Sequence, residues 1–323
     1  MVMGGGTFVI SLPKEWAKMN GVTKGSTLAV EELSLRKLMI RPIDESSTKP
    51  KEFAIDFTGD DLRQVVSDVT GAYLLGYDLI KIGGRRVIPR GDRSALKETI
   101  ARLIGLEIMD EDSKQITVQF LLEPSAIDPE RIVRRMSGIL EGMMRDTAEA
   151  LAESDRGLLS LVAERDDEVD RLYFLLVRTI RTATLHPELA ERYGLGPVDV
   201  LDYRVLASFL ESVGDAVAEL SKKLHSLTIP RKAAKEYSRC VRLLIELDDL
   251  ATRSFLSRKA GRSKEVYSKM ESLAASIGEG SARIAKLTGA EGYALIETLG
   301  TLDRIGKLLV DVSDLATTAQ LVS

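Results

Sequence analysis

The chain has 323 residues and a net charge of −4; 44% of its residues are apolar and 29% are charged. These values are typical of a globular protein with two or three domains, and they argue against a nucleic-acid coat over the whole surface. No apolar run approaches the roughly 20 residues that span a bilayer, and no signal-peptide pattern is present. The single cysteine, Cys240, excludes a disulfide framework and a multi-cysteine metal site. We expect a cytoplasmic protein that is not embedded in a membrane.

Residues 1–45 show the two-residue period of half-buried strands. Phe8, Ile10 and Leu12 alternate with their neighbours in "TFVISL". Pro13 fits the first turn of a short helix, where its missing N–H costs nothing. The stretch "STLAVEELSLRKLMIRP" then predicts two strands around a turn. The sequence therefore predicts a small, β-rich first domain over 1–45.

A second domain is predicted over residues 51–125. It follows the polar stretch "DESSTKPKE" (44–52), whose composition is typical of a linker. The pattern predicts strand, helix, strand, helix and strand in that order, with helices from Asp60 to about Leu75 and from Ser94 to Gly105. This order indicates a small α/β domain.

A basic loop lies within this second domain, in "GGRRVIPRGDR" (83–93). Glycine-flanked arginines can present backbone N–H and guanidinium groups to a phosphate or another anion. The alternative is an ordinary solvated loop, and the Gly-Lys-Ser/Thr of a nucleotide-binding loop is missing. The candidate anion ligands are Arg85, Arg86, Arg90 and Arg93.

Residues 129–322 are predicted to be almost entirely helical, beginning at an Asp128 cap with Pro129 in the first position. Long helices joined by short turns indicate antiparallel bundles. The predicted helices cover about 129–153, 157–184, 198–228, 230–258, 262–288 and 291–321. "LESVGDAVAEL" (210–220) aligns with "LDRIGKLLVDV" (302–312), which matches Gly214 with Gly306. We therefore predict two three-helix bundles related by duplication, in a multidomain and mainly α protein.

Two pairs of acids stand beside the apolar stripes of these helices. Asp166 and Asp170 are four residues apart, as are Glu211 and Asp215, so each pair lies on one helix face. Bringing four carboxylates together is unfavourable unless a cation joins them, and oxygen ligands suit hard or borderline divalent ions. The alternative is that the acids are solvated and paired with neighbouring arginines: Arg165, Arg171 or Arg204.

The motifs "RDDEVDRL" (165–172) and "LESVGDAVAEL" resemble the PhoU family, regulators of phosphate uptake. The resemblance covers residues 129 to 321 and implies two pseudo-repeated three-helix bundles with iron or zinc clusters on the bundle surface. It implies that Asp166, Asp170, Glu211 and Asp215 are the metal ligands. It further implies a partner, either the phosphate ABC transporter or its signalling apparatus.

The second repeat departs from the family pattern. Lys307 stands where the first repeat has Asp215, and Ser263 and Tyr267 stand where it has Asp166 and Asp170. Only Asp303 remains of the four acids. Because a lysine ammonium repels a cation, we expect a metal site in the first half alone.

The head resembles the SpoVT/AbrB swapped-hairpin domain. The resemblance rests on the Pro-Lys after a short strand, the step from Gly21 to Gly25 and two closing strands. It implies a homodimer formed by hairpin exchange and basic residues presented to DNA. The strand that precedes the glycines in that family has no evident counterpart in "MVM", so we expect the first strand of the head to be missing. The candidate DNA contacts are Lys14, Lys18, Lys24, Arg36, Lys37 and Arg41.

The fusion of such a head to a PhoU-like body is typical of archaeal-type phosphate uptake regulators. The resemblance implies a non-enzymatic, negative regulator of phosphate transport or transcription that binds promoter DNA. One alternative is a regulator whose head only dimerises. Another is a carboxylate-bridged metallohydrolase, which the lack of a Glu-x-x-His motif disfavours.

Overall fold

The protein is described by a computed structural model that covers residues 2–3, 7–34, 37–42, 50–59, 61–257, 263–286 and 290–320. The chain divides into two compact units, Met1–Lys51 and Glu52–Ser323. Among the described residues, no helix is long and apolar enough to cross a membrane.

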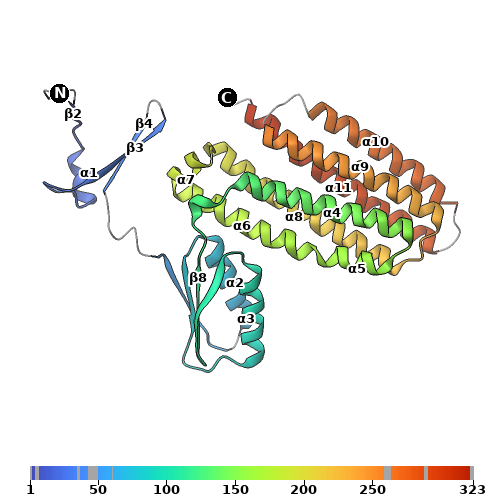
Figure 1. Cartoon of the computed structure of the whole chain (residues 1–323), viewed down its shortest axis with the longest axis horizontal. Coiled ribbons are helices and arrows are strands. Elements are labelled where there is room, and N and C mark those ends of the chain that lie inside the picture. The colour runs from blue at the N-terminus through green and yellow to red at the C-terminus, as the bar shows by residue number, and fades with distance from the viewer. Residues whose placement is uncertain are drawn as a thin grey trace. The chain divides into compact units, whose positions relative to one another are not determined.

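The first unit is a small head of short strands and one helix (Figure 1). Strand β1 (Val2–Met3) pairs antiparallel with β2 (Thr7–Phe8), so a short strand does precede the glycines, contrary to the expectation from sequence. Helix α1 (Lys14–Met19) follows Pro13. The head ends in an antiparallel hairpin of β3 (Leu28–Ser34) and β4 (Lys37–Pro42).

The head leaves much of its apolar surface uncovered. The half-buried strand predicted over 7–12 ends at Phe8, and Ile10 beyond it is 65% exposed. Met19 and Leu38 are 81% and 62% exposed, and α1 buries none of its residues. One copy of this head therefore lacks the second layer that its apolar side chains require.

The second unit begins with a four-stranded sheet covered by α2 and α3 (Figure 1). Its elements are β5 (Glu52–Asp56), α2 (Leu62–Leu74), β6 (Leu79–Gly83), α3 (Arg90–Arg102), β7 (Leu106–Glu111) and β8 (Gln115–Phe120). The strand order is β5-β6-β8-β7, with β5 and β6 parallel and β8 antiparallel to both of its neighbours. The core of the sheet is apolar, with Ile80, Ile82 and Val118 fully buried.

Strand β7 is an element that the sequence pattern did not reveal. The expected order was strand, helix, strand, helix, strand, whereas β7 adds a sixth element before β8. Its sequence "LEIMDE" buries only Leu106 fully, and it lies at the edge of the sheet. A mostly polar edge strand lacks the apolar alternation that identifies strands closer to a core.

The rest of the second unit is an elongated helical bundle (Figure 1). Its first half contains α4 (Pro129–Glu153), α5 (Arg156–Glu164), α6 (Asp166–Leu185), the short α7 (Pro187–Arg192) and α8 (Pro197–Ser226); its second half contains α9 (Arg231–Ser257), α10 (Ser263–Ile284) and α11 (Ala290–Gln320). The halves pack through α4 against α9 and α8 against α11. Gly214 of α8 faces α6, and Gly306 of α11 faces α10, so the two glycines are equivalent, as predicted. The predicted multidomain, mainly helical fold is confirmed.

One predicted helix is divided in two. The sequence predicts a single helix over 157–184, but α5 ends and α6 begins at Arg165, where ψ is −11°. The guanidinium of Arg165 binds Asp146 of α4 at 2.6 Å and lies over Gly142, where a Cβ atom would come within 2.9 Å of it. A contact with another helix therefore stabilises the break.

The sheet and the bundle are joined by a buried arginine of α6. Arg178, whose side chain is 4% exposed, donates hydrogen bonds to the carbonyls of Tyr73 and Tyr77, at 2.6 and 3.0 Å. Its guanidinium carbon lies 3.7 Å from the centre of the Phe120 ring. Asp78 lies 3.6 Å away. The Arg178 side chain thus donates hydrogen bonds to carbonyls at the C-terminal end of α2 and packs on the sheet.

We predict that Arg178→Met lowers the free energy of unfolding by about 3 kcal/mol, because it removes the hydrogen bonds that the buried guanidinium donates to the carbonyls of Tyr73 and Tyr77. Urea unfolding followed by circular dichroism measures the change. The exposed Arg192 provides the control, since Arg192→Met should stay within about 0.5 kcal/mol of the wild type. Equal effects of both substitutions would contradict the role of Arg178.

Candidate functional site

The four predicted metal ligands lie on two adjacent helices. Asp166 and Asp170 are on the first two turns of α6, which opens with "DDE" because the helix dipole favours acids at this end. Glu211 and Asp215 are on α8, which packs against α6. Each of the four carboxylates is close enough to at least one acid of the other helix for their charges to interact. The structure therefore brings both pairs to one surface.

Gly214 sets the distance between the helices at this point. A Cβ atom at Gly214 would lie 2.9 Å from Oδ1 of Asp166 and 3.2 Å from Cγ1 of Val169. The Asp166 oxygen is buried and has no hydrogen-bond partner among the described residues. A side chain in this position would displace the carboxylate. The glycine thus permits a close approach that holds one acid out of water.

The environment disfavours the charged forms of these acids. Burial, followed by the charges of Asp170 and Asp215, raises the pKa of Asp166 to about 7. Burial also raises the pKa of Asp170 and of Glu211, and in both cases Asp215 is the largest electrostatic contribution. Lys222 and Arg204 act in the opposite direction on Asp166 and Glu211 respectively. Additional positive charge at this surface would therefore stabilise the native state.

The arginines that could have neutralised the cluster are directed elsewhere. Arg165 binds Asp146, and Arg204 donates to the Ser208 hydroxyl at 2.7 Å while lying over the Tyr173 ring. Within the described ranges, Arg171 forms no ion pair with any of the four acids. The ion pairs of the four acids with these three arginines are therefore absent among the described residues, while Asp215 is exposed to solvent.

The donor set suits a hard cation by composition, but its side chains do not yet converge on one point. Among the described residues, no three Asp, Glu, His or Cys side chains are arranged to hold a metal ion. Asp215 is exposed, and the unpartnered Oδ1 of Asp166 is the kind of buried group that a cation satisfies. Asp166 and Asp215 already lie close enough for their side chains to interact directly, so an ion shared by both helices would bind at this pair first.

One neighbour of the cluster was missed from the sequence. A cavity of about 470 Å³ opens beside Asp166, and Glu164, Lys222 and His225 contribute to its lining. Lys222 follows Asp215 by seven residues on α8, a spacing that returns to the same helix face. That signal was available in the sequence, and it places one cation at the edge of the acidic cluster.

The equivalent surface of the second half is neutralised. Lys307 binds Asp303 one turn away on α11, at 2.7 Å. Tyr267, at the position of Asp170, donates a hydrogen bond to Asp314 at 2.6 Å. The two halves share a fold but present different chemistry at matching positions.

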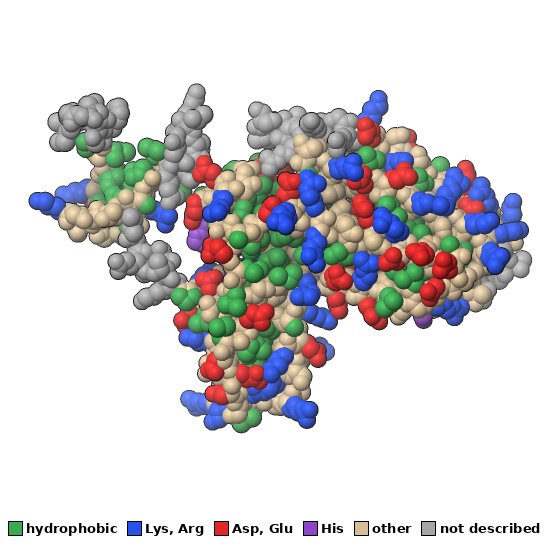
Figure 2. Space-filling model, in the orientation of Figure 1, with side chains coloured by type: hydrophobic (Ala, Val, Ile, Leu, Met, Phe, Trp, Pro, Cys, Tyr) green, Lys and Arg blue, Asp and Glu red, His purple; other side chains and the backbone are tan. Residues whose placement is uncertain are grey.

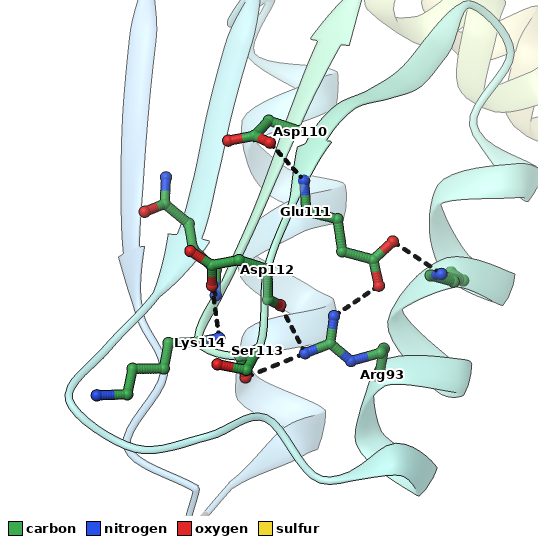
Figure 3. Close-up of polar contacts among 8 residues, drawn as sticks. Arg93, Asp110, Glu111, Asp112, Ser113 and Lys114 are labelled. Carbon is green, nitrogen blue, oxygen red and sulfur yellow. Dashed lines mark hydrogen bonds and ion pairs between the residues drawn. The ribbon is translucent and has the colours of Figure 1, made fainter.

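The predicted anion loop is anchored to the sheet. Figure 3 shows Arg93 bound to Glu111 and to the carbonyls of Asp112 and Ser113, at 2.8 and 3.1 Å for the two carbonyls. Arg90 lies in the first turn of α3, since the helix begins four residues before the expected Ser94. Gly84 is required by close packing, because a Cβ atom there would lie 2.4 Å from the Phe57 carbonyl.

The backbone of this loop is also occupied. The N–H of Gly84 donates to Lys114 and that of Ile88 to Ser113, which removes two of the groups that would face an anion. The side chains of Arg85, Arg86 and Arg90 are exposed. Arg93 thus holds the loop against the β7–β8 turn, and anion binding by the other three stays a prediction.

The candidate DNA contacts are distributed over the head. Lys14 and Lys18 are exposed and one turn apart on α1, while Lys24 is exposed in the following turn. Arg41 is exposed on β4. Arg36 lies outside the described residues, as does the side chain of Lys37. Among the described candidates, Lys14 and Lys18 lie on one face of α1.

Two family models match the sequence. The PhoU domain model matches residues 133–224, and the model described as "Antidote-toxin recognition MazE, bacterial antitoxin" matches residues 1–48. The part of the chain over residues 133–224 is similar to the PhoU domain. The match covers α4 to α8 and contains all four acids, whereas the second half with Lys307 falls outside it. The predicted combination of a PhoU-like body and an AbrB-like head is confirmed at the level of domains.

Solved structures show the same fold. PhoU from Pseudomonas aeruginosa is 16% identical, with a TM-score of 0.51 over 60% of this chain and 96% of its own. The phosphate transport system regulatory protein PhoU from Streptococcus pneumoniae is 14% identical, with a TM-score of 0.51 over 60% of this chain and 94% of its own. At this identity the likeness shows the fold alone. No curated protein matches the sequence.

We predict that Gly214→Ala destabilises the protein by about 1–3 kcal/mol, because the new methyl group overlaps Asp166 and Val169. The matched control is Gly138→Ala in α4, where no atom lies within 4 Å of the added Cβ. That change should stabilise the helix by up to about 1 kcal/mol. Thermal unfolding in the presence of a chelator compares the two, and destabilisation by both would contradict the close approach at Gly214.

Proposed function

We propose that this protein is a regulator of phosphate uptake, without enzymatic activity, whose first bundle half binds a metal ion. The observation that carries the proposal is the position of the PhoU match. It covers the two helices on which Asp166, Asp170, Glu211 and Asp215 come together, and it leaves out the half in which Lys307 replaces an acid. The residues matched by the PhoU model thus include the surface on which the four acids gather.

The ion would be held by carboxylates from α6 and α8. When bound, a divalent or ferric ion such as zinc or iron supplies positive charge that compensates the four acids. Gly214 allows Asp166 to lie between the helices, and Asp215 of α8 lies close enough for its side chain to interact with that of Asp166. Binding would tie α6 to α8 beside the cavity that Lys222 lines.

The partner proposed for the bundle is the phosphate ABC transporter or its signalling apparatus, through which the protein would act as a negative regulator. The Streptococcus pneumoniae structure is named a phosphate transport system regulatory protein, which supports this assignment for a chain of the same fold. No nucleophile–base pair accompanies the acidic cluster in the sequence, which favours regulation over hydrolysis.

The head is proposed to form a homodimer. Ile10, Met19 and Leu38 are exposed in the single chain, and a second copy would cover them and complete the sheet. A dimer would present Lys14 and Lys18 of α1 twice, an arrangement suited to contacts with the phosphates of promoter DNA. The alternative is a head that dimerises without binding DNA.

We predict that adding Zn²⁺ at about a hundredfold excess over its Kd stabilises the protein by roughly 3 kcal/mol through mass action. Asp215→Ala should abolish the resulting rise in melting temperature, because it removes a central ligand. Asp303→Ala, at the position of the second half that matches Glu211, should retain it, because Lys307 pairs with this acid. A thermal shift assay with Zn²⁺ and then Fe³⁺ reads this out, and equal behaviour of the two variants would refute the metal site.

We predict that the double substitution Ile10→Lys and Leu38→Lys converts the full-length dimer to a monomer, because it places charges in the surface to be buried. The control replaces two leucines of similar exposure on the bundle, Leu161 and Leu185, with lysine. Light scattering at micromolar concentration gives the mass. A dimer that survives the head substitutions would exclude the head as the interface.

A further inference from the structure

A groove of about 770 Å³ runs between α4 and α9, on a part of the bundle that the acidic cluster does not use. These helices come from different halves and lie side by side (Figure 1). Four cations line the groove against one acid, Glu149, and the cations are Arg145, Arg231, Lys235 and Arg242. Its net positive charge contrasts with the net charge of −4 of the whole chain.

Three of the cations form a row on α9. Arg231, Lys235 and Arg242 are separated by four and seven residues, which places them within about 40° of one another around the helix axis. At 1.5 Å per residue the row is about 16 Å long. Arg145 extends from α4 on the opposite wall. The positive charge is therefore arranged along a line.

The basic and acidic residues on the other side of α9 already have partners. Arg239 binds Glu279 of α10, at 3.0 Å, and Glu236 binds Arg283, at 2.7 Å. In contrast, neither Arg231 nor Lys235 has a carboxylate partner among the described residues. Arg242 donates to the Ser238 carbonyl, and Arg145 lies 4.0 Å from Glu141. The charges facing the groove are thus the ones that α10 leaves uncompensated.

The floor of the groove is made of small and apolar side chains. Ala148 and Ala152 of α4 face Ala234 of α9, and Leu151 and Ile245 extend the apolar surface. The Ser238 hydroxyl donates to the Ala148 carbonyl, at 3.3 Å, and holds the helices together there. Small side chains leave a channel that guanidinium and ammonium groups can reach from both walls. Figure 2 shows Lys and Arg side chains gathered at the end of the bundle where α9 begins.

We propose that this groove binds an anion that carries several phosphates in a row. A single phosphate cannot contact cations at both ends of a row about 16 Å long, whereas a chain of phosphates can follow it. Arginine and lysine are the usual partners of phosphate oxygens, and the volume is in the range that small ligands fill. The chain of phosphates can come from an inorganic oligophosphate or from a nucleoside triphosphate. The proposal does not depend on the metal site or on the head.

Isothermal titration of the full-length protein at low salt, with a chelator present, tests this with three probes: inorganic tripolyphosphate, ATP and orthophosphate. We expect saturable binding of tripolyphosphate and ATP and at least tenfold weaker binding of orthophosphate. Binding should weaken with added salt, because the contacts are between charges. Equal affinities would indicate that the phosphates alone are recognised, and tighter ATP binding that the base rests on the alanine floor.

The test variant is Lys235→Gln with Arg242→Gln, which should weaken tripolyphosphate binding at least tenfold. The control is Arg239→Gln with Arg253→Gln, on the same helix and with the same loss of charge, but with side chains paired to Glu279 and Asp249 outside the groove. It should bind within twofold of the wild type. Absence of saturable binding, or equal weakening in both double variants, would overturn the proposal.

Discussion

The close approach of α6 and α8 at Gly214 is the contact on which the chemistry of the first half depends. Without a side chain at this position, Asp166 lies between the helices with one oxygen unpartnered among the described groups. The approach brings acids from both helices into mutual range, and burial together with like charge raises the pKa of Asp166 to about 7. The absence of a side chain at Gly214 therefore brings like charges together, and a bound cation would remove their repulsion.

The second half has the same close helix contact but lacks the repulsion between acids. Gly306 makes the same close approach to α10, where a Cβ atom would lie 2.6 Å from Leu273. Its neighbour on the surface is the Lys307–Asp303 pair, which is neutral as a whole. The two halves therefore share the helix contact, while the charges around it differ. The groove between α4 and α9 adds a third surface, of opposite sign, where the two halves meet.

A second acid of the bundle is buried in a different environment. Asp248 of α9 is fully buried, and burial raises its pKa to about 7 as well. Its Oδ2 accepts a hydrogen bond from Ser137 of α4, at 2.7 Å, so this side chain links the two halves inside the core. Asp166 differs because it lies among other acids, the half-buried Asp170 and Glu211 and the exposed Asp215.

The sequence by itself determined most of the long helices and the match between Gly214 and Gly306. Apolar spacing and the Asp128 cap located α4, α8 and α9 to within a few residues, because amphipathic periodicity is a local property. The spacing of four between Asp166 and Asp170 put the acids on one face without knowledge of any partner helix. Edge strand β7 was not predicted, because its few apolar residues show no clear period.

Only the tertiary structure decided which charges meet. Arg165 could have neutralised the acids beside it in sequence, but it binds Asp146 of α4 and breaks the helix there. Arg93 was a candidate anion ligand from sequence. In the structure its guanidinium binds Glu111 and two carbonyls at the β7–β8 turn. The basic row on α9 lines a groove because α4 packs beside it and contributes alanines to the floor. Arg239, on the same helix, is instead paired with Glu279 of α10. Charge pairing between segments distant in sequence has no period, so packing must place the partners before their chemistry can be known.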